Sequence, residues 1–482
     1  MRVLENLEPK KVFYYFEELC QIPHGSGNVE AISNYLKAFA EERGLEVIQD
    51  HVKNIIIMKE ASVGYEEEPT VIIQGHMDMV AVHKPELNID MTKEPLKLKV
   101  DGDRVYAEGT SLGGDDGIAV AYALAILDDD CIKHPRLEVV ITVDEETGMD
   151  GAREIDLSML KGNRLLNIDS EEEGIFLTSC AGGARVDCRL EPAFTKMQGI
   201  RYELKVCGLA GGHSGVEIHK ERGNSNKLAG RLLWHLYLEE LEIGLVSMQG
   251  GLADNAIPRE TQIELIVDNS QKEKFLTEMK AFEKTVKAEL ATKDPEFQVE
   301  VKECEEADML AVCGNEFSVL AALLNALPNG VQAMSADIPG LVETSLNLGI
   351  LKLDKDLQLG ISVRSSIESS KQALIEKLMS VVVLAGGEAE VRGEYPGWAY
   401  RVDSPLRDKM VTLYEEMYGE KPQVEAIHAG LECGLLAGKI KDLDCVSFGP
   451  NMSNIHTTEE FLSISSTERV WKYLVQLLGR KG

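Results

Sequence analysis

Apolar residues along the chain fall into short runs that alternate with longer segments of helical character. Runs at 70–74, 137–143 and 165–168 are rich in apolar residues, as expected of strands buried on both faces. The segments at 9–20 and 117–127 instead have helical spacing or an alanine-rich composition. This alternation predicts an α/β fold, with a central mixed, mostly parallel sheet that is flanked by helices.

Each of the three predicted strands leads into residues that can bind a metal ion. The first leads to His76 and Asp78, which lie two positions apart and can therefore point to the same side. The second leads to Glu145 and Glu146, and the third leads to Asp169. Open α/β sheets place their active sites beyond the carboxyl ends of the strands, so these side chains are candidates for one site.

Two further positions extend this set. Asp115 and Asp116 stand where a glycine-rich loop becomes the alanine-rich helix, and either carboxylate could also simply complement the positive end of the helix dipole. His456 follows a short apolar run at 445–448. Two histidines with several carboxylates form a nitrogen and oxygen ligand set that suits catalytic zinc, or cobalt or manganese. The sequence therefore predicts a binuclear hydrolytic metal site.

The length of the chain predicts more than one domain. It has 482 residues, whereas single hydrophobic cores stop growing at roughly 250 to 300 residues. We expect a catalytic metal-binding domain at 1–183 and 397–482, interrupted by an inserted α+β domain at 184–396. Within the insertion, NAIPRETQIELIVD and DIPGLVETSLNLGI resemble each other, which suggests an internal duplication.

Charge and cysteine usage narrow the partners and the compartment. The net charge of -31 disfavours nucleic acid and anionic membranes, because both would repel such a surface. Nine cysteines without CxxC spacing indicate free thiols in a reducing compartment. The first 19 residues lack the continuous apolar core of a signal peptide. We therefore expect a cytoplasmic protein with a small-molecule substrate.

Taken together and in order, the motifs resemble those of the co-catalytic zinc peptidases of the aminoacylase and carboxypeptidase group. Within that group, the chain looks most like the Xaa-His dipeptidases, which are also called aminoacyl-histidine or cytosol non-specific dipeptidases. The phrases that carry this resemblance are GHMDMV, GGDDG, VDEETGMDGA, NIDSEE, GGHSGVEIHKERGN, HAGLECG, YPGW and SNIHTTEE. The resemblance implies a zinc exopeptidase-like fold in which the insertion is a lid domain.

The resemblance also implies roles for individual residues. It implies two Zn²⁺ ions per chain, with Co²⁺ or Mn²⁺ as alternatives, and a general base, Glu145, that serves a metal-bridging water. Asp78 would orient the imidazole of His76. Asp115 would bridge the two metals, although a shift of the loop by one residue would give that role to Asp116. The implied metal ligands are His76, Asp115, Glu146, Asp169 and His456.

The resemblance implies substrate contacts in the insertion. His213 would polarise the scissile carbonyl, while Asn255 and Arg364 would hold the substrate. For Arg364 the plain alternative is a surface ion pair, because the chain carries 81 acidic residues. His428 and Glu432 in HAGLECG suit either a substrate contact or a strand-to-helix turn.

The predicted activity is metal-dependent hydrolysis of dipeptides with free termini, of the Xaa-His type or of broad specificity. An N-acyl amino acid deacylase or a carboxypeptidase of the same fold remains an alternative. A non-catalytic peptide- or metal-binding protein is an alternative of another class, although a binder needs no base beside the metals. The resemblance also leaves a homodimer open.

Overall fold

The computed structural model describes residues 2–482, which divide into two compact units. Unit 1 comprises the described residues up to Ser179 together with Tyr400–Ala426 and Leu431–Gly482. Unit 2 comprises Cys180–Ala399 and Ile427–Gly430. The chain thus leaves unit 1 and later returns to it, so unit 2 is inserted within unit 1.

Unit 1 is built on an eight-stranded sheet in the order β1-β2-β6-β3-β7-β21-β8-β20. Strands β6, β3, β7 and β21 pair in parallel, whereas β1, β2 and β8 join the sheet antiparallel. The predicted α/β class with a mixed sheet is confirmed, and the parallel pairing lies at its centre. The bounds are β1 Glu46–Gln49, β2 Ile55–Lys59, β3 Val71–His76, β6 Leu137–Thr142, β7 Arg164–Asn167, β8 Ile175–Cys180, β20 Gln423–Ile427 and β21 Asp444–Ser447.

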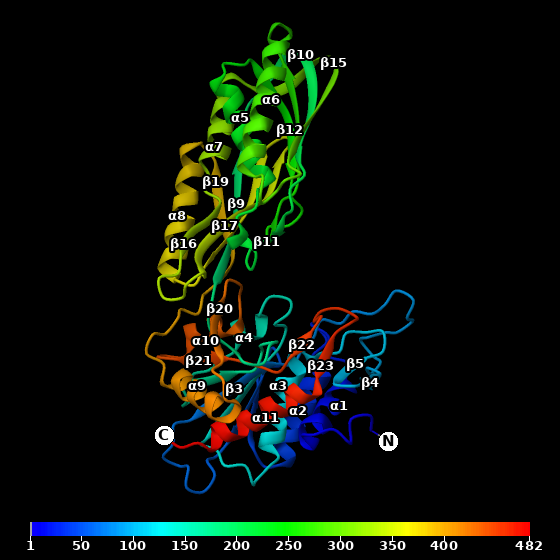
Figure 1. Ribbon diagram of the computed structural model, residues 1–482, viewed down its shortest axis with the longest axis vertical. Helices are drawn as coiled ribbons and strands as arrows, with labels where there is room; N and C mark the ends of the chain where they lie inside the picture. The colour runs from blue at the N-terminus through cyan, green and yellow to red at the C-terminus, as the bar shows by residue number, and fades with distance from the viewer. Residues whose placement is uncertain (1) are drawn as a thin grey trace. The chain divides into compact units, whose positions relative to one another are not determined.

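Helices and a second, smaller sheet complete unit 1 (Figure 1). The smaller sheet has the order β22-β23-β5-β4, with bounds Met452–Ser453, Phe461–Ser463, Arg104–Ala107 and Leu98–Asp101. The helices are α1 Lys10–Cys20, α2 Glu30–Glu42, α3 Gly114–Leu127, α4 Asp150–Glu154, α9 Pro405–Tyr418, α10 Glu432–Lys439 and α11 Ile464–Gly479.

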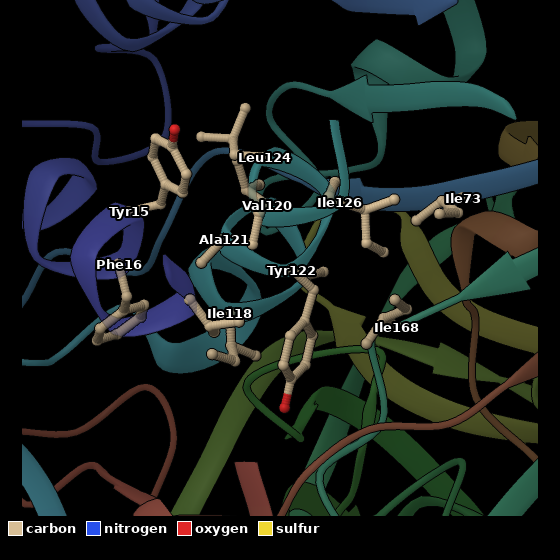
Figure 2. Close-up of a cluster of buried hydrophobic side chains, with 14 of the residues drawn as sticks. Tyr15, Phe16, Ile73, Ile118, Val120, Ala121, Tyr122, Leu124, Ile126 and Ile168 are labelled. Atoms are coloured by element: carbon tan, nitrogen blue, oxygen red, sulfur yellow. The ribbon is translucent and has the colours of Figure 1, made fainter. Parts of the chain in front are cut away.

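Helix α3 is the buried element that anchors the proposed site. All fourteen of its residues are buried, as expected of an alanine-rich helix that is apolar on every side. Figure 2 shows Tyr15 and Phe16 of α1 on one side of α3, and Ile73 and Ile168 on the other. Each fully buried large apolar side chain contributes about 1.5 to 3 kcal/mol. This packing fixes the helix whose first turn carries the paired aspartates.

Gly75 allows α3 to approach β3 closely. A Cβ atom at this position would lie 2.4 Å from Asp116 Oδ2 and 2.7 Å from the Cβ of Ala119. A larger residue would therefore push the helix away from the strand. The close approach brings the start of α3 beside His76, the residue that follows Gly75.

Unit 2 contains a nine-stranded sheet whose neighbouring strands run antiparallel. Its order is β14-β10-β15-β12-β17-β18-β9-β19, with β16 added beside β17 and with β14 also paired to β12. The bounds are β9 Gly182–Leu190, β10 Phe194–Cys207, β12 Ile243–Gly250, β14 Thr261–Val267, β15 Gln298–Cys313, β16 Gly330–Met334, β17 Val342–Leu353, β18 Leu357–Ser365 and β19 Glu388–Tyr395.

The helices of unit 2 lie along one face of this sheet, as Figure 1 shows. Their apolar side chains form a second core with those of the strands, separate from the core of unit 1. The helices are α5 Ser225–Leu238, α6 Lys272–Glu289, α7 Gly314–Ala326 and α8 Glu368–Leu384. A two-stranded ribbon, β11 Gly212–His213 with β13 Ala256–Ile257, completes the unit. Among the described residues, no helix has both the length and the apolar character that crossing a membrane requires.

Candidate metal centre

Three neighbouring strands of unit 1 end at the same edge of its sheet. Strand β3 ends at His76, β6 ends three residues before Glu145, and β7 ends two residues before Asp169. Because β6, β3 and β7 run parallel and adjacent, their carboxyl ends meet there. The sheet therefore gathers residues that lie up to 93 positions apart in the chain, as the pairing of Gln74 with Asn167 shows.

The carboxylate of Asp115 lies between two histidines. Its Oδ1 is 3.2 Å from His76 Nε2, and its Oδ2 is 3.1 Å from His456 Nε2. Asp115 and Asp116 have non-helical backbone angles although they lie at the start of α3, and the peptide bond between them is cis. Asp115 thus has one oxygen directed at each histidine, which is the arrangement that a bridging carboxylate needs.

Each histidine has a further carboxylate beside it. Asp169 Oδ1 lies 3.6 Å from His76 Nε2, and Glu146 Oε1 lies 2.8 Å from His456 Nε2. Ligand atoms of Asp115, Glu146 and His456 all lie within 4.8 Å of one another. The structure therefore brings together all five ligands that the resemblance implied, and their role as ligands stays a prediction.

Asp116 has a different environment from Asp115. Its Oδ2 accepts a hydrogen bond from the backbone N–H of His76 at 3.2 Å, and its Oδ1 is buried with no hydrogen-bond partner in residues 2–482. Ligand atoms of Asp116, His76 and Asp169 lie within 4.8 Å of one another, whereas Asp115 forms such a group with Glu146 and His456. Burial, aided by Asp169, raises the pKa of Asp116 well above its usual range. The geometry therefore favours Asp115 over Asp116 as the bridging residue.

These residues fit a pair of divalent cations. Their donor atoms are two imidazole nitrogens and several carboxylate oxygens, a set that suits catalytic zinc and related ions. The carboxylates are packed closely in a buried position, and the unpartnered Asp116 oxygen shows that protein groups alone do not satisfy them. Buried carboxylates are costly unless they are paired or coordinate a metal, so cations would stabilise this cluster.

The carboxylates change the proton affinity of both histidines. Asp115 and Glu146 raise the pKa of His456 to about 10. Burial opposes a charge on His76, yet the carboxylates of Asp115, Asp169 and Asp78 raise its pKa well above the usual value. Burial also disfavours charge on Asp115, but the two histidines hold its pKa below the usual range. A metal ion must therefore displace protons when it binds here.

Asp78 connects a proposed ligand to the proposed base. The Nδ1–H of His76 donates to the backbone oxygen of Asp78 at 2.9 Å, which leaves Nε2 facing Asp115 and Asp169. The carboxylate of Asp78 accepts hydrogen bonds from the backbone N–H of Glu145 at 3.1 Å and from Ser26 Oγ at 2.8 Å. Asp78 therefore fixes the tautomer of His76 and the position of the 145–146 pair.

Glu145 lies beside the metal-ligand cluster. Ligand atoms of His76, Glu145 and Glu146 lie within 4.8 Å of one another. Burial raises the pKa of Glu145 to about 9, and although His76 opposes this, nearby carboxylates add to it. A bound cation would favour the charged carboxylate and lower this pKa toward neutral, where a carboxyl group can take up and release a proton.

A buried polar layer beneath the ligands was missed by the sequence analysis. Gln74, Thr142 and Asn167 each precede a ligand or the base by two or three residues on the three strands. Gln74 accepts from Asn167 Nδ2 at 2.6 Å, and Glu432 accepts from Gln74 Nε2 and Thr142 Oγ1, each at 2.6 Å. Glu432, at the start of α10, thus connects β6 and β3 through its hydrogen bonds. This contact is structural, whereas the alternative for Glu432 was a contact with the substrate. The feature of the sequence that could have revealed this layer is the presence of polar residues within otherwise apolar strands.

In unit 2, the β11–β13 ribbon places His213 next to Asn255. His213 pairs with Ala256, and the N–H of Ser214 donates to the backbone oxygen of Asn255 at 2.8 Å. His213 and Asn255 both line a cavity of about 800 Å³ within this unit. His213, which the resemblance assigned to the scissile carbonyl, and Asn255, which it assigned to holding the substrate, are therefore neighbours.

Arg364, on β18, lies in a partly buried setting. Its Nη1 donates to Tyr395 Oη at 3.2 Å, and its Nε is buried with no hydrogen-bond partner among residues 2–482. This environment differs from the surface ion pair that was the plain alternative. His428 is buried nearby in the chain's second unit, where its Nε2 lies 2.8 Å from Ser345 Oγ. Burial, followed by the charge of Arg364, lowers the pKa of His428 to about 3.

Comparisons with known proteins agree with this fold and this site. The chain matches the sequence profile of peptidase family M20/M25/M40 over residues 72–480. It is 37% identical over 485 residues to the cytosol non-specific dipeptidase of Escherichia coli (strain K12), and the match covers 99% of both chains. The crystal structure of aminoacylhistidine dipeptidase from Vibrio alginolyticus is similar with a TM-score of 0.94 and 36% identity, covering 99% of this chain and 98% of that one.

A more distant structure shows the fold alone. The aminopeptidase from Bacillus cereus has a TM-score of 0.57 at 15% identity, over 98% of both chains. The fold is thus that of the zinc exopeptidase-like metallopeptidases, which confirms the predicted fold class. The chain belongs to peptidase family M20/M25/M40. The resemblance that the motifs indicated is therefore confirmed.

Proposed function

We propose that this chain is a metal-dependent dipeptidase that hydrolyses dipeptides with free termini, of the Xaa-His type or of broad specificity. The observation that carries the proposal is the Asp115 carboxylate, with His76 at 3.2 Å on one side and His456 at 3.1 Å on the other. Support comes from two relatives that are named as dipeptidases and that align over 99% of this chain. The name of the first relative and the free state of all nine cysteines support a cytoplasmic location.

The proposal assigns two Zn²⁺ ions to each chain, with Co²⁺ or Mn²⁺ compatible with the same donors. His76 and Asp169 would hold one ion, Glu146 and His456 would hold the other, and Asp115 would bind both. When bound, such ions would polarise the peptide carbonyl and lower the pKa of a water molecule. No nucleic acid or membrane takes part in this reaction.

Glu145 is proposed as the general base. It would accept a proton from the attacking water and later donate a proton to the leaving amine. This role is supported by the closeness of Glu145 to the proposed ligands His76 and Glu146 and by the hydrogen bond from its N–H to Asp78. Asp78 would keep the proton of His76 on Nδ1, so that Nε2 stays free to ligate.

His213 is proposed to stabilise the negative charge that develops on the carbonyl oxygen. Its Nδ1 accepts hydrogen bonds from the N–H groups of Gly215 at 3.1 Å and Val216 at 3.2 Å. A neutral imidazole with such an Nδ1 carries its proton on Nε2. Burial, followed by the charge of Arg364, lowers the pKa of His213 and keeps the ring neutral. Its Nε2–H is therefore a donor for an oxyanion.

Asn255 and Arg364 are proposed to hold the substrate, and Arg364 is proposed to bind its C-terminal carboxylate. The guanidinium of Arg364 matches a planar carboxylate with two parallel hydrogen bonds, and its buried, unpartnered Nε leaves one such donor open. Anchoring the C-terminal carboxylate one residue beyond the cleaved bond would limit the substrate to a dipeptide.

The test is an assay of the purified protein on three substrate classes, before and after chelation. We expect turnover of free dipeptides, loss of that turnover on chelation, and recovery when zinc, cobalt or manganese is returned. Exclusive turnover of N-acyl amino acids or of longer peptides would instead identify a deacylase or a carboxypeptidase. Binding of dipeptides without turnover at full metal occupancy would identify a non-catalytic binding protein.

A further inference from the structure

Glu460 is a buried acidic residue that neither the proposed ligands nor the proposed base includes. Its side chain is 3% exposed and points into unit 1 toward the loop at 112–115. Its Oε2 accepts hydrogen bonds from the backbone N–H groups of Leu112 at 2.7 Å and Gly113 at 3.2 Å. Its Oε1 accepts from Gly114 at 2.8 Å and from Asp115 at 3.5 Å. One carboxylate thus binds four consecutive backbone donors.

These four donors precede and begin helix α3. The first N–H groups of a helix have no partner within the helix, and a negative charge placed there is favourable. Here the acceptor comes from a residue more than 300 positions away instead of from a local capping side chain, since no side chain caps α3 locally. Glu460 therefore serves as a long-range cap for the helix that presents Asp115.

The loop needs such a restraint because of its sequence. Gly113 adopts a left-handed conformation, with φ of 70°, which favours glycine, and Gly114 follows it directly. Consecutive glycines lose more conformational entropy on ordering than other residues do. The contacts of Glu460 order this loop at the point where the chain enters Asp115.

A single short segment therefore contacts Asp115 at both ends. Four residues before Glu460, His456 places its Nε2 3.1 Å from the Asp115 carboxylate. Glu460 contacts the backbone of the same aspartate, and the N–H of Glu460 donates to the oxygen of Thr457 at 3.3 Å. The segment 456–460 thus sets both the backbone position of Asp115 and one of the two histidines that flank it.

We propose that Glu460 is a positioning residue for the metal pair, which holds the backbone of Asp115 so that its carboxylate meets both His76 and His456. The Glu460 carboxylate hydrogen-bonds to backbone N–H groups of residues 112–115, and it would not touch the substrate. The inference rests on the proposed function, because it assigns Asp115 to both metals. If Glu460 holds Asp115 in this way, the unsubstituted protein binds zinc more tightly than a variant that lacks the Glu460 carboxylate.

The test compares three variants by zinc affinity, measured by competition with a chelator, and by thermal unfolding. Glu460→Gln keeps the shape of the side chain but replaces one acceptor oxygen by an NH₂ group, which faces backbone donors. We expect its zinc affinity to fall about 10- to 100-fold, as for other residues that orient metal ligands. At saturating zinc, KM for a dipeptide should stay within about twofold, because substrate contacts are unchanged.

Two control variants separate positioning from general stability. Glu459→Gln changes the neighbouring exposed carboxylate, whose partner is Lys84, and should leave zinc affinity unchanged. Tyr122→Phe removes a buried hydrogen bond from α3 to Thr467 and should lower the unfolding temperature without changing zinc affinity. An unchanged zinc affinity in Glu460→Gln, or an equal loss in Tyr122→Phe, would overturn the proposal.

Hydrogen exchange in the unsubstituted, metal-free protein keeps the test decisive if Glu460→Gln does not fold. We expect the amides of Gly113 and Gly114 to exchange at least about 100-fold more slowly than unprotected amides. Exchange at the unprotected rate would contradict the proposal. Zinc affinity and hydrogen exchange do not depend on turnover, so a failure of Glu460 to position Asp115 is distinguishable from a failure to hydrolyse dipeptides.

Discussion

The carboxylate of Asp78 accepts a hydrogen bond from the backbone N–H of Glu145 at 3.1 Å. The backbone oxygen of Asp78 also accepts from Nδ1 of His76 at 2.9 Å. One residue therefore orients a proposed metal ligand and positions the proposed base, which lies 67 residues further along the chain. The proposed proton carrier and the proposed metal ligand are thus positioned by one buried residue, which uses its side chain for the first and its backbone oxygen for the second.

The choice between the two adjacent aspartates can be tested with variants of matched shape. Asp115→Asn should reduce the zinc content below two per chain and lower kcat at least about 100-fold, because a bridging carboxylate offsets the repulsion between two cations. Asp116→Asn should retain two zinc ions, since its amide oxygen can still accept from the N–H of His76. Elemental analysis of both variants is the measurement. Full zinc content in Asp115→Asn with loss in Asp116→Asn would show that Asp116 is the bridge.

Arg364 tests how the substrate's length is recognised. Arg364→Ala should raise KM for dipeptides roughly 10- to 100-fold, as expected for loss of charge-assisted hydrogen bonds. Arg364→Lys should restore only part of the affinity, because a point charge cannot reproduce the paired geometry. Arg189→Ala, at an exposed arginine of the same unit, is the control.

To test whether Arg364 binds the C-terminal carboxylate of the substrate, a dipeptide is compared with its C-terminal amide. Wild-type protein should prefer the free carboxylate, and Arg364→Ala should lose most of that preference. Equal effects on both substrates would remove Arg364 from the role of carboxylate anchor.

Zinc affinity should rise with pH. In the metal-free protein, the neighbouring carboxylates raise the pKa of His456 to about 10 and that of His76 well above its usual value. Both imidazole rings therefore carry a second proton, and a positive charge, at neutral pH. As the pH rises, protons compete less strongly with zinc for the histidine nitrogens. The zinc affinity should therefore increase by up to about tenfold per pH unit for each proton displaced. Chelator competition between pH 6.5 and 8.5 measures this slope.

Two histidine variants define the origin of that slope. His456→Gln should bind less zinc with a shallower pH dependence, because one of the displaced protons is gone. His235→Gln should keep the wild-type slope, since His235 pairs with Glu278 on the helices of unit 2. A zinc affinity that does not change with pH would contradict the account of these histidines.

The sequence predicted the proposed ligands because they obey local rules. The ends of buried strands were visible as apolar runs, and the period of two placed His76 and Asp78 on one side. The rule that parallel strands place their sites at the carboxyl edge then joined residues from distant parts of the chain. The fold class followed from the same alternation of strands and helices.

The contacts that hold these ligands were not visible in the sequence, because they depend on tertiary packing. Glu432 binds Gln74 across 358 positions, and Glu460 binds the loop at 112–115 across more than 340. The preference for Asp115 over Asp116 rests on the contacts of Asp115 with both His76 and His456, which no local pattern predicts. The hydrogen bond between Arg364 and Tyr395 likewise depends on how two strands that are distant in the sequence align with each other.

The most direct test of the central claim is Glu145→Gln, because it separates metal binding from proton transfer. The amide keeps the size of the side chain but cannot carry the proton. Glu154→Gln, an exposed site on α4, serves as the control, and zinc content and dipeptide kinetics are measured on the same samples. We predict two zinc ions per chain in Glu145→Gln, with kcat lowered about 10²- to 10⁴-fold and KM little changed. A kcat within a few-fold of the wild-type value at full zinc content would contradict it.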